Sequence, residues 1–435
     1  MRGACLLLGV AGMELIAWLA VSVHLGQLAT FAVVRAAQAR VSAPEAAATL
    51  LDFGDDEVLP DFMTRDVVHP YLGFVLDRGF QAQPRERRGG PDAVEYGFSL
   101  SEPGIFHDPF QDTLVVAVTG GSVAFNLAGG GAESLREAFL GRVPPGITRV
   151  RIVNLALPGY KQPQQLMTLN YFTVLGAHFD LVVNLDGVNE VALPVMENMS
   201  KGVSPFFPRG WYFRARAFDS PVQVQTGEVT FLRARRAHVA QAFAGRPFRY
   251  SMTAGLAWFI VDARCAQGIA AREEALVQTV DSTRSSYVVS GPGFSCQDET
   301  EMYQVLARVW ARSSLAMAQV ASSGGARYVH FLQPNQHVPG SKPMGPAERA
   351  LAVGKYSPFA RHVRLGYPKL VAAGRRLQAE GVCFHDLTGL FQSVEEPVYI
   401  DPCCHLNEVG ERMLAEAIAA LATEDLAAAD SSITG

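Results

Sequence analysis

The sequence predicts an α/β fold built on a parallel β-sheet with helices on both faces. Short, β-branched apolar runs recur along the chain, and segments with apolar residues at helical spacing lie between them. A hydrophobic content of 49% in 435 residues allows a sizeable core. The net charge is −5 and there is no long basic stripe, so a nucleic-acid partner is disfavoured.

The N-terminus carries a long apolar run, from Ala4 to Val34. Apart from Glu14 and His24 it has no ionisable side chain, and it exceeds the roughly 20 residues that cross a bilayer core. We predict an uncleaved transmembrane anchor over residues 1–35. A cleaved signal peptide and a buried soluble helix are the alternatives. Glu14 argues against the anchor, because a carboxylate costs several kcal/mol near the membrane centre.

Residues 36–112 are expected to form a juxtamembrane linker and an N-terminal extension. The alanine-rich stretch Ala36–Glu57 favours helix, and Val67–Phe80 is typical of a strand followed by a turn. No internal repeat is present, so the regular pattern that follows predicts a single main domain.

That domain is predicted over residues 113–426. Its expected strands are Thr113–Val118, Val150–Leu155, Leu181–Leu185 and Tyr328–Leu332. Its expected helices are Ala132–Leu140, Pro163–Leu175, Met302–Val320 and Asn407–Leu426. Between residues 192 and 301 the alternation breaks, and we expect a partly helical insertion or cap over the strand ends there.

Three successive strands end in loops that carry Ser122, Gly159 and Asn189. Ligands of open parallel sheets bind outside the carboxyl ends of the strands, so these loops are expected to converge. The segment VYIDPCCHLN, just before the last helix, adds Asp401 and His405. A hydroxyl, an imidazole with a carboxylate close by, and open amides are the groups that transfer an acyl unit through a serine ester.

In this hypothesis Ser122 is the nucleophile, His405 takes its proton, and Asp401 orients the imidazole. The N–H groups of Ser122 and Gly159 and the side-chain amide of Asn189 form the oxyanion hole. Each residue also has a structural interpretation. The structural alternatives are a turn or phosphate-binding loop before Ser122, a turn at Gly159, a helix cap at Asn189, a core histidine at position 405 and a turn residue at Asp401.

Four motifs resemble blocks of the SGNH, or GDSL, hydrolase family, and membrane-anchored bacterial members in particular. In order they resemble its first, second, third and fifth blocks: TGGSVA (Thr119–Ala124), NLALPGY (Asn154–Tyr160), LDGVNE (Leu185–Glu190) and DPCCHLN (Asp401–Asn407). The likeness runs roughly from Thr113 to Leu421, with residues 192–301 outside it. It implies a three-layer α/β/α sandwich and the site roles given above.

Two positions depart from the family pattern. Gly121 stands where an aspartate is common, and Pro402 stands three residues before His405, where the family places its acidic residue. Asp401 lies one residue further back, so a backbone carbonyl or Asp386 is the alternative partner for the imidazole.

The resemblance implies a serine esterase acting on an acyl ester, with acetyl the expected group, on a carbohydrate or cell-envelope polymer. The alternatives are an O-acetyltransferase that uses the same serine and a catalytically inactive polysaccharide-binding or assembly module. Neither a cofactor nor a metal is expected, because no His, Asp and Glu cluster has ligand spacing.

The expected location is a single-pass membrane anchor with the catalytic domain periplasmic or extracellular. The basic residues that flank the apolar run nearly cancel as an orientation signal. A Cys265–Cys296 bridge would suit that oxidising location, and ordinary buried thiols are the alternative.

Overall fold

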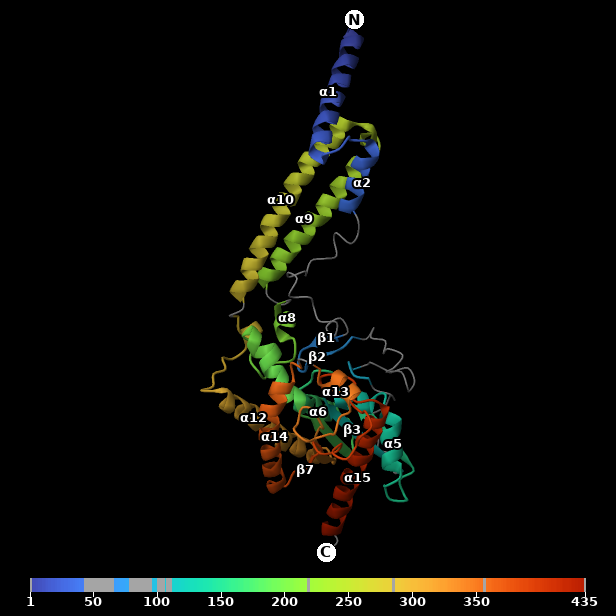
Figure 1. Cartoon of the computed structure of the whole chain (residues 1–435), viewed down its shortest axis with the longest axis vertical. Helices are drawn as coiled ribbons and strands as arrows, with labels where there is room; N and C mark the ends of the chain where they lie inside the picture. The colour runs from blue at the N-terminus through green and yellow to red at the C-terminus, as the bar shows by residue number, and fades with distance from the viewer. Residues whose placement is uncertain are drawn as a thin grey trace. The chain divides into compact units, whose positions relative to one another are not determined.

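The computed structural model describes residues 2–42, 66–77, 96–99, 106, 112–216, 220–283, 286–354 and 357–433. The chain divides into two compact units (Figure 1). The helical unit combines Met1–Leu59 with Phe213–Val289, and the α/β unit combines Pro60–Tyr212 with Ser290–Gly435. This division differs from the expected one, because the N-terminal segment joins most of the expected insertion in one unit.

The α/β unit is built on a five-stranded parallel sheet with strand order β4-β3-β5-β6-β7. Its strands are β3 (Thr113–Gly120), β4 (Arg149–Asn154), β5 (Leu181–Asp186), β6 (Arg327–Leu332) and β7 (Cys383–Asp386). The predicted α/β class and its four strands are confirmed. β7 escapes prediction, because four residues that include His385 and Asp386 are too short and too polar to show a strand pattern.

Helices cover both faces of this sheet, since every residue of β3 and β5 is buried. On one face α5 (Ala132–Leu140) packs against α15 (Glu408–Ile433). On the other, α12 (Glu299–Ser323) packs against α6 (Gln164–Val174) and α14 (Ala360–Ala379). Right-handed crossovers place α5 and α6 on opposite faces, because the β3–β4 and β4–β5 connections cross the sheet in opposite directions.

The carboxyl ends of β3 and β5 are neighbours, with Thr119 paired to Asn184 and Gly120 to Leu185. The chain leaves β3 toward one face of the sheet and β5 toward the other. Open α/β sheets hold their ligands at such a point, where neighbouring connections diverge. Two short helices, α4 (Ser122–Ala128) and α7 (Val188–Leu193), begin there.

A small antiparallel hairpin of the α/β unit, β1 (Asp66–His69) with β2 (Gly73–Leu76), lies where a strand and a turn were expected. Phe74 packs edge-on against Tyr160, whose hydroxyl donates a 2.5 Å hydrogen bond to the Phe74 carbonyl. The hairpin therefore helps to bury the loop that follows β4.

The remaining short elements of the chain are α8 (Trp211–Arg216), α11 (Tyr287–Ser290), α13 (Pro346–Ala352), a π-helical turn (Pro194–Asn198) and 3-10 turns (Met199–Lys201 and Phe248–Tyr250).

The helical unit consists of α1 (Arg2–Leu25), α2 (Phe31–Ser42), α9 (Ser220–Ala244) and α10 (Met252–Thr283). α9 and α10 form a long hairpin that packs against both N-terminal helices. Most of the insertion expected at residues 192–301 is thus this hairpin.

α1 is long and apolar enough to cross a membrane, over Leu8–Leu25. The apolar run does not continue as one helix to Val34, because Gly26 adopts φ +63° and the chain turns before α2. α2 covers the start of the expected helical linker, and residues 43–57 lie outside the described residues.

Candidate active site

Ser122 is placed by two glycines at the end of β3. Gly120 adopts φ +148°, and a Cβ there would lie 2.1 Å from the Leu185 carbonyl oxygen. A Cβ on Gly121 would lie 2.3 Å from Nδ2 of Asn189. Only glycine fits at position 120, so the strand can turn sharply and present Ser122 as the first residue of α4.

His405 bridges Ser122 and Asp401, as the sequence analysis predicted for these residues. Its Nε2 lies 2.7 Å from Ser122 Oγ, and its Nδ1 is hydrogen-bonded to Asp401 Oδ2. The other Asp401 oxygen accepts the backbone N–H groups of Cys403 (2.9 Å), Cys404 (3.1 Å) and His405 (3.3 Å). The loop therefore folds around the Asp401 carboxylate and aims it at the imidazole despite the proline that follows.

The alternative acid, Asp386, stands at the end of β7 and accepts the N–H of Thr388 at 2.9 Å. Its carboxylate makes a local turn, whereas the Asp401 carboxylate contacts the ring of His405. The structure thus selects Asp401 as the partner of His405.

The Asp401–His405 pair sets the protonation of the site. Burial would raise the pKa of Asp401, but the hydrogen bond and charge of His405, with the loop N–H groups, lower it to about 2. Burial would lower the pKa of His405, but the hydrogen bond and charge of Asp401 raise it above its ordinary value. An ionised Asp401 accepts from Nδ1–H and leaves Nε2 free to take a proton from Ser122.

The loop that carries Asp401 is held by the segment after β6, which the sequence analysis missed. Gln336 donates to the Asp401 carbonyl (2.9 Å) and Asn335 to the Cys403 carbonyl (3.0 Å). His337 Nε2 lies 2.8 Å from the Pro402 carbonyl oxygen. A polar segment directly after a predicted strand was the available signal, the same one that identified Asn189.

The predicted oxyanion donors also meet at this edge of the sheet. Asn189 Nδ2 donates to the Tyr160 carbonyl (2.8 Å) and lies against Gly121, which leaves a second N–H on the same nitrogen. Within the described part of the chain, the N–H groups of Ser122 and Gly159 donate no hydrogen bond. The Asn189 amide thus lies against the residue before Ser122, and Gly159 directly precedes the residue whose carbonyl accepts from that amide.

Arg209 is a further side chain at this edge that the sequence analysis missed. A Cβ on Gly159, which adopts φ +82°, would lie 2.3 Å from Cδ of Arg209. The guanidinium pairs with Glu197, with Nε 2.9 Å from both carboxylate oxygens. No sequence signal links residues 159 and 209, because their contact depends on how the loop before α8 folds back.

A buried polar network supports the start of α7, where Asn189 stands. Glu190 accepts the N–H of Gly187 (2.9 Å) and the side-chain amide of Gln165 (3.0 Å). Burial and the nearby Asp186 charge raise the pKa of Glu190 well above its ordinary value. Because Gly187 adopts φ +151°, this cap fixes the sharp turn that orients Asn189.

The cysteines whose side chains the structure describes carry free thiols: Cys265, Cys296, Cys383, Cys403 and Cys404. Cys265 belongs to the helical unit and Cys296 to the α/β unit, so a bridge between them stays a prediction.

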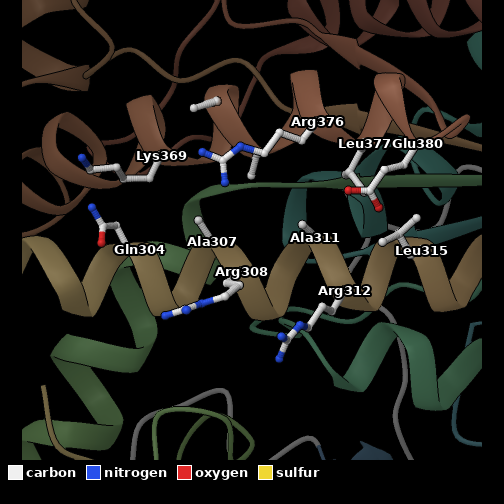
Figure 2. A pocket seen from close by; sticks show the side chains of 12 residues that line it. Gln304, Ala307, Arg308, Ala311, Arg312, Leu315, Lys369, Arg376, Leu377 and Glu380 are labelled. Carbon is white, nitrogen blue, oxygen red and sulfur yellow. The ribbon is translucent and has the colours of Figure 1, made fainter.

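A groove of about 610 Å³ lies elsewhere on the α/β unit, between α12 and α14 (Figure 2). Four basic side chains line it, Arg308, Arg312, Lys369 and Arg376. None of its lining residues comes from the loops that carry the serine, the histidine or the oxyanion donors. We place the candidate active site at the strand ends, because the geometry of the reacting groups is found there.

A scan of the chain against protein-family models found no match, and a search among curated proteins found no relative.

Proposed function

We propose that the protein is a membrane-anchored serine esterase of the SGNH type. The observation that carries the proposal is the line of contacts from Asp401 through His405 to Ser122, with the donors of Ser122, Gly159 and Asn189 beside it. The three-layer arrangement of that family is consistent with a parallel sheet that has helices on both faces.

The residues suggest a two-step reaction. Ser122 Oγ bonds to the ester carbonyl carbon while its proton moves to His405 Nε2; the carbon–oxygen bond to the alcohol then breaks, and the alcohol leaves with that proton. Water next gives a proton to His405 and bonds to the acyl carbon. The bond to Ser122 breaks, the acid leaves, and Ser122 recovers its proton.

Charge develops on the carbonyl oxygen in both steps. The N–H groups of Ser122 and Gly159 and the side-chain amide of Asn189 are the donors proposed to receive it. Asp401, with its pKa held at about 2, stays ionised and stabilises the imidazolium that forms.

The proposed substrate is an acyl ester, with acetyl the expected group, on a carbohydrate or cell-envelope polymer. This substrate class rests on the resemblance of the four motifs alone, and the proposed location is outside the cytoplasm.

Labelling with a fluorophosphonate probe tests the nucleophile directly. We expect the full-length protein in detergent to be labelled on the peptide that contains Ser122, and Ser122→Ala to be unlabelled and inactive toward p-nitrophenyl acetate. Equal turnover by the two proteins would contradict the proposal. Adding an oligosaccharide acceptor then separates hydrolysis from acetyl transfer, because transfer gives an acetylated sugar in place of free acetate.

A further inference from the structure

Glu14, the one acidic residue in the apolar helix α1, is hydrogen-bonded to the start of α10. Its carboxylate accepts the hydroxyl of Ser251 (2.5 Å) and the backbone N–H groups of Met252 (2.6 Å) and Thr253 (3.3 Å). The first N–H groups of a helix lack partners within the helix and favour a negative charge. Glu14 is therefore a cap for α10, and its charge is compensated within the helical unit.

The contact fixes the height of the hairpin along α1. Glu14 is twelve residues after Arg2, which is about 18 Å at 1.5 Å per residue, in a helix about 36 Å long. The turn between α9 and α10, residues 245–251, is thus level with the middle of α1. We call these residues the hairpin turn.

Packing between α1 and α10, at residues of α1 that follow Glu14, holds the hairpin at this position along α1. Ala17 and Val21 of α1 are buried in one cluster with Met252 and Trp258 of α10. The Trp18 indole donates to the Ala29 carbonyl (2.9 Å). One side of α1 is thus covered by protein from Glu14 onward, and the hairpin is a fixed neighbour of the helix.

The outer surface at this height is apolar. On α1, Leu15 and Ile16 are 58% and 67% exposed. Within the hairpin turn Phe248 and Tyr250 are 48% and 56% exposed. Contiguous exposed apolar side chains on a soluble surface are unfavourable, and lipid would cover them.

The hairpin turn also carries two arginines, Arg246 and Arg249. Arg246 is exposed, and the Arg249 guanidinium lies 4.6 Å from the centre of the Tyr250 ring. Aromatic rings next to long basic side chains are typical of the membrane interface, where the rings and stems meet acyl chains and the charged ends reach phosphates.

We propose that the hairpin turn enters the phospholipid bilayer beside α1. A membrane that takes up α1 meets the hairpin turn halfway along that helix. Phe248 and Tyr250 then lie among acyl chains, the side chains of Arg246 and Arg249 extend from that depth toward the lipid phosphates, and Glu14 holds the hairpin turn in place.

Photocrosslinking of the full chain tests this placement. p-Benzoylphenylalanine replaces Phe248 in one variant and Phe231 in another; Phe231 lies on α9 and is 66% exposed, which makes it a matched control. Both proteins are reconstituted into phosphatidylcholine–phosphatidylglycerol vesicles, irradiated and analysed by intact mass. We expect several-fold more phospholipid adduct at position 248 than at position 231.

Equal adduct yields at the two positions would overturn the proposal, and so would a protein–protein adduct at 248 in place of a lipid adduct. Flotation with the vesicles shows separately whether α1 holds the chain in the membrane. A protein that does not float contradicts both the anchor and the hairpin turn, whereas one that floats without a lipid adduct at 248 contradicts only the latter.

Variants of Glu14 test the cap. Glu14→Gln keeps an acceptor oxygen for Met252 and Thr253, and we expect it to retain most of the adduct at 248. Glu14→Leu removes the acceptor and is expected to lower the adduct yield while the protein still floats. An unchanged yield in Glu14→Leu would overturn the role given to Glu14.

Discussion

Among the described residues of the α/β unit, serine, histidine and aspartate side chains meet at two places. The site set is Ser122, His405 and Asp401, and the core set is Ser314, His330 and Asp186. In the core set His330 lies 2.8 Å from Ser314 Oγ through Nδ1 and 2.9 Å from Asp186 Oδ1 through Nε2. The two sets thus share their residue types, but the serine contacts Nε2 of the histidine in the site set and Nδ1 in the core set.

They differ in access and in what surrounds the histidine. The side chains of His405 and Asp401 are 25% and 32% exposed, whereas those of His330 and Asp186 are 0% and 1% exposed. The His330 ring also packs against Trp310, with ring centres 4.6 Å apart. Solvent reaches the histidine of the site set and not that of the core set. On the proposed function, we infer that this access and the nearby N–H groups distinguish a catalytic triad from a structural one.

Replacing each serine by alanine should separate the two sets most widely. We expect Ser122→Ala to lower kcat by about 10⁴-fold or more, because the nucleophile is lost. Ser314→Ala should keep kcat within a few-fold of the wild type. Hydrolysis of p-nitrophenyl acetate measures both, and similar losses in the two variants would contradict the distinction.

The next largest effect is expected at the oxyanion donors, which only the site set has beside it. Asn189→Ala removes one donor and should lower kcat by about 10²–10³-fold. Because Asn189 also donates to the Tyr160 carbonyl, the melting temperature has to be measured on the same sample. A variant that melts like the wild type and keeps full activity would show that Asn189 is not an oxyanion donor.

Replacing the two histidines should affect stability in the reverse order, with the larger loss of unfolding free energy in the core set. His330→Leu leaves Asp186 buried with only its bonds from Trp310 and Asn184, so we expect a loss of about 3 kcal/mol in the free energy of unfolding. His405→Leu should cost much less, since its surroundings are partly exposed. Urea unfolding followed by circular dichroism measures both variants, and equal losses would remove the structural role of the core set.

Much of the site could be predicted because parallel strands impose it. Apolar runs mark the strands, strand ends meet at one edge, and the polar or glycine residues after those ends were Ser122, Gly159 and Asn189. His405 followed from its position before the last helix. The partner of His405 could not be predicted, because the conformation of the loop that brings Asp401 to the imidazole ring depends on contacts from residues 335–337.

The association of segments that lie far apart in the chain could not be predicted from the sequence for a similar reason. The apolar run gave α1, but nothing in composition indicates that Glu14 binds the start of a helix more than 230 residues later. The buried network around Asp186 was also hidden, since His330 and Trp310 lie inside segments that otherwise indicate plain core elements.

The pH dependence of kcat/KM gives the smallest and most specific test of the site set. His405 must be neutral to take the Ser122 proton, so the rate should fall as pH drops below its pKa, which Asp401 holds above the ordinary value near 6.5. Asp401→Asn removes the negative charge that stabilises the imidazolium. We therefore expect the acidic limb of the residual activity to move to lower pH. Asp386→Asn is the matched control and should leave the limb where it is; a shift in this variant, or none in Asp401→Asn, would assign the acid to Asp386 or to a backbone carbonyl.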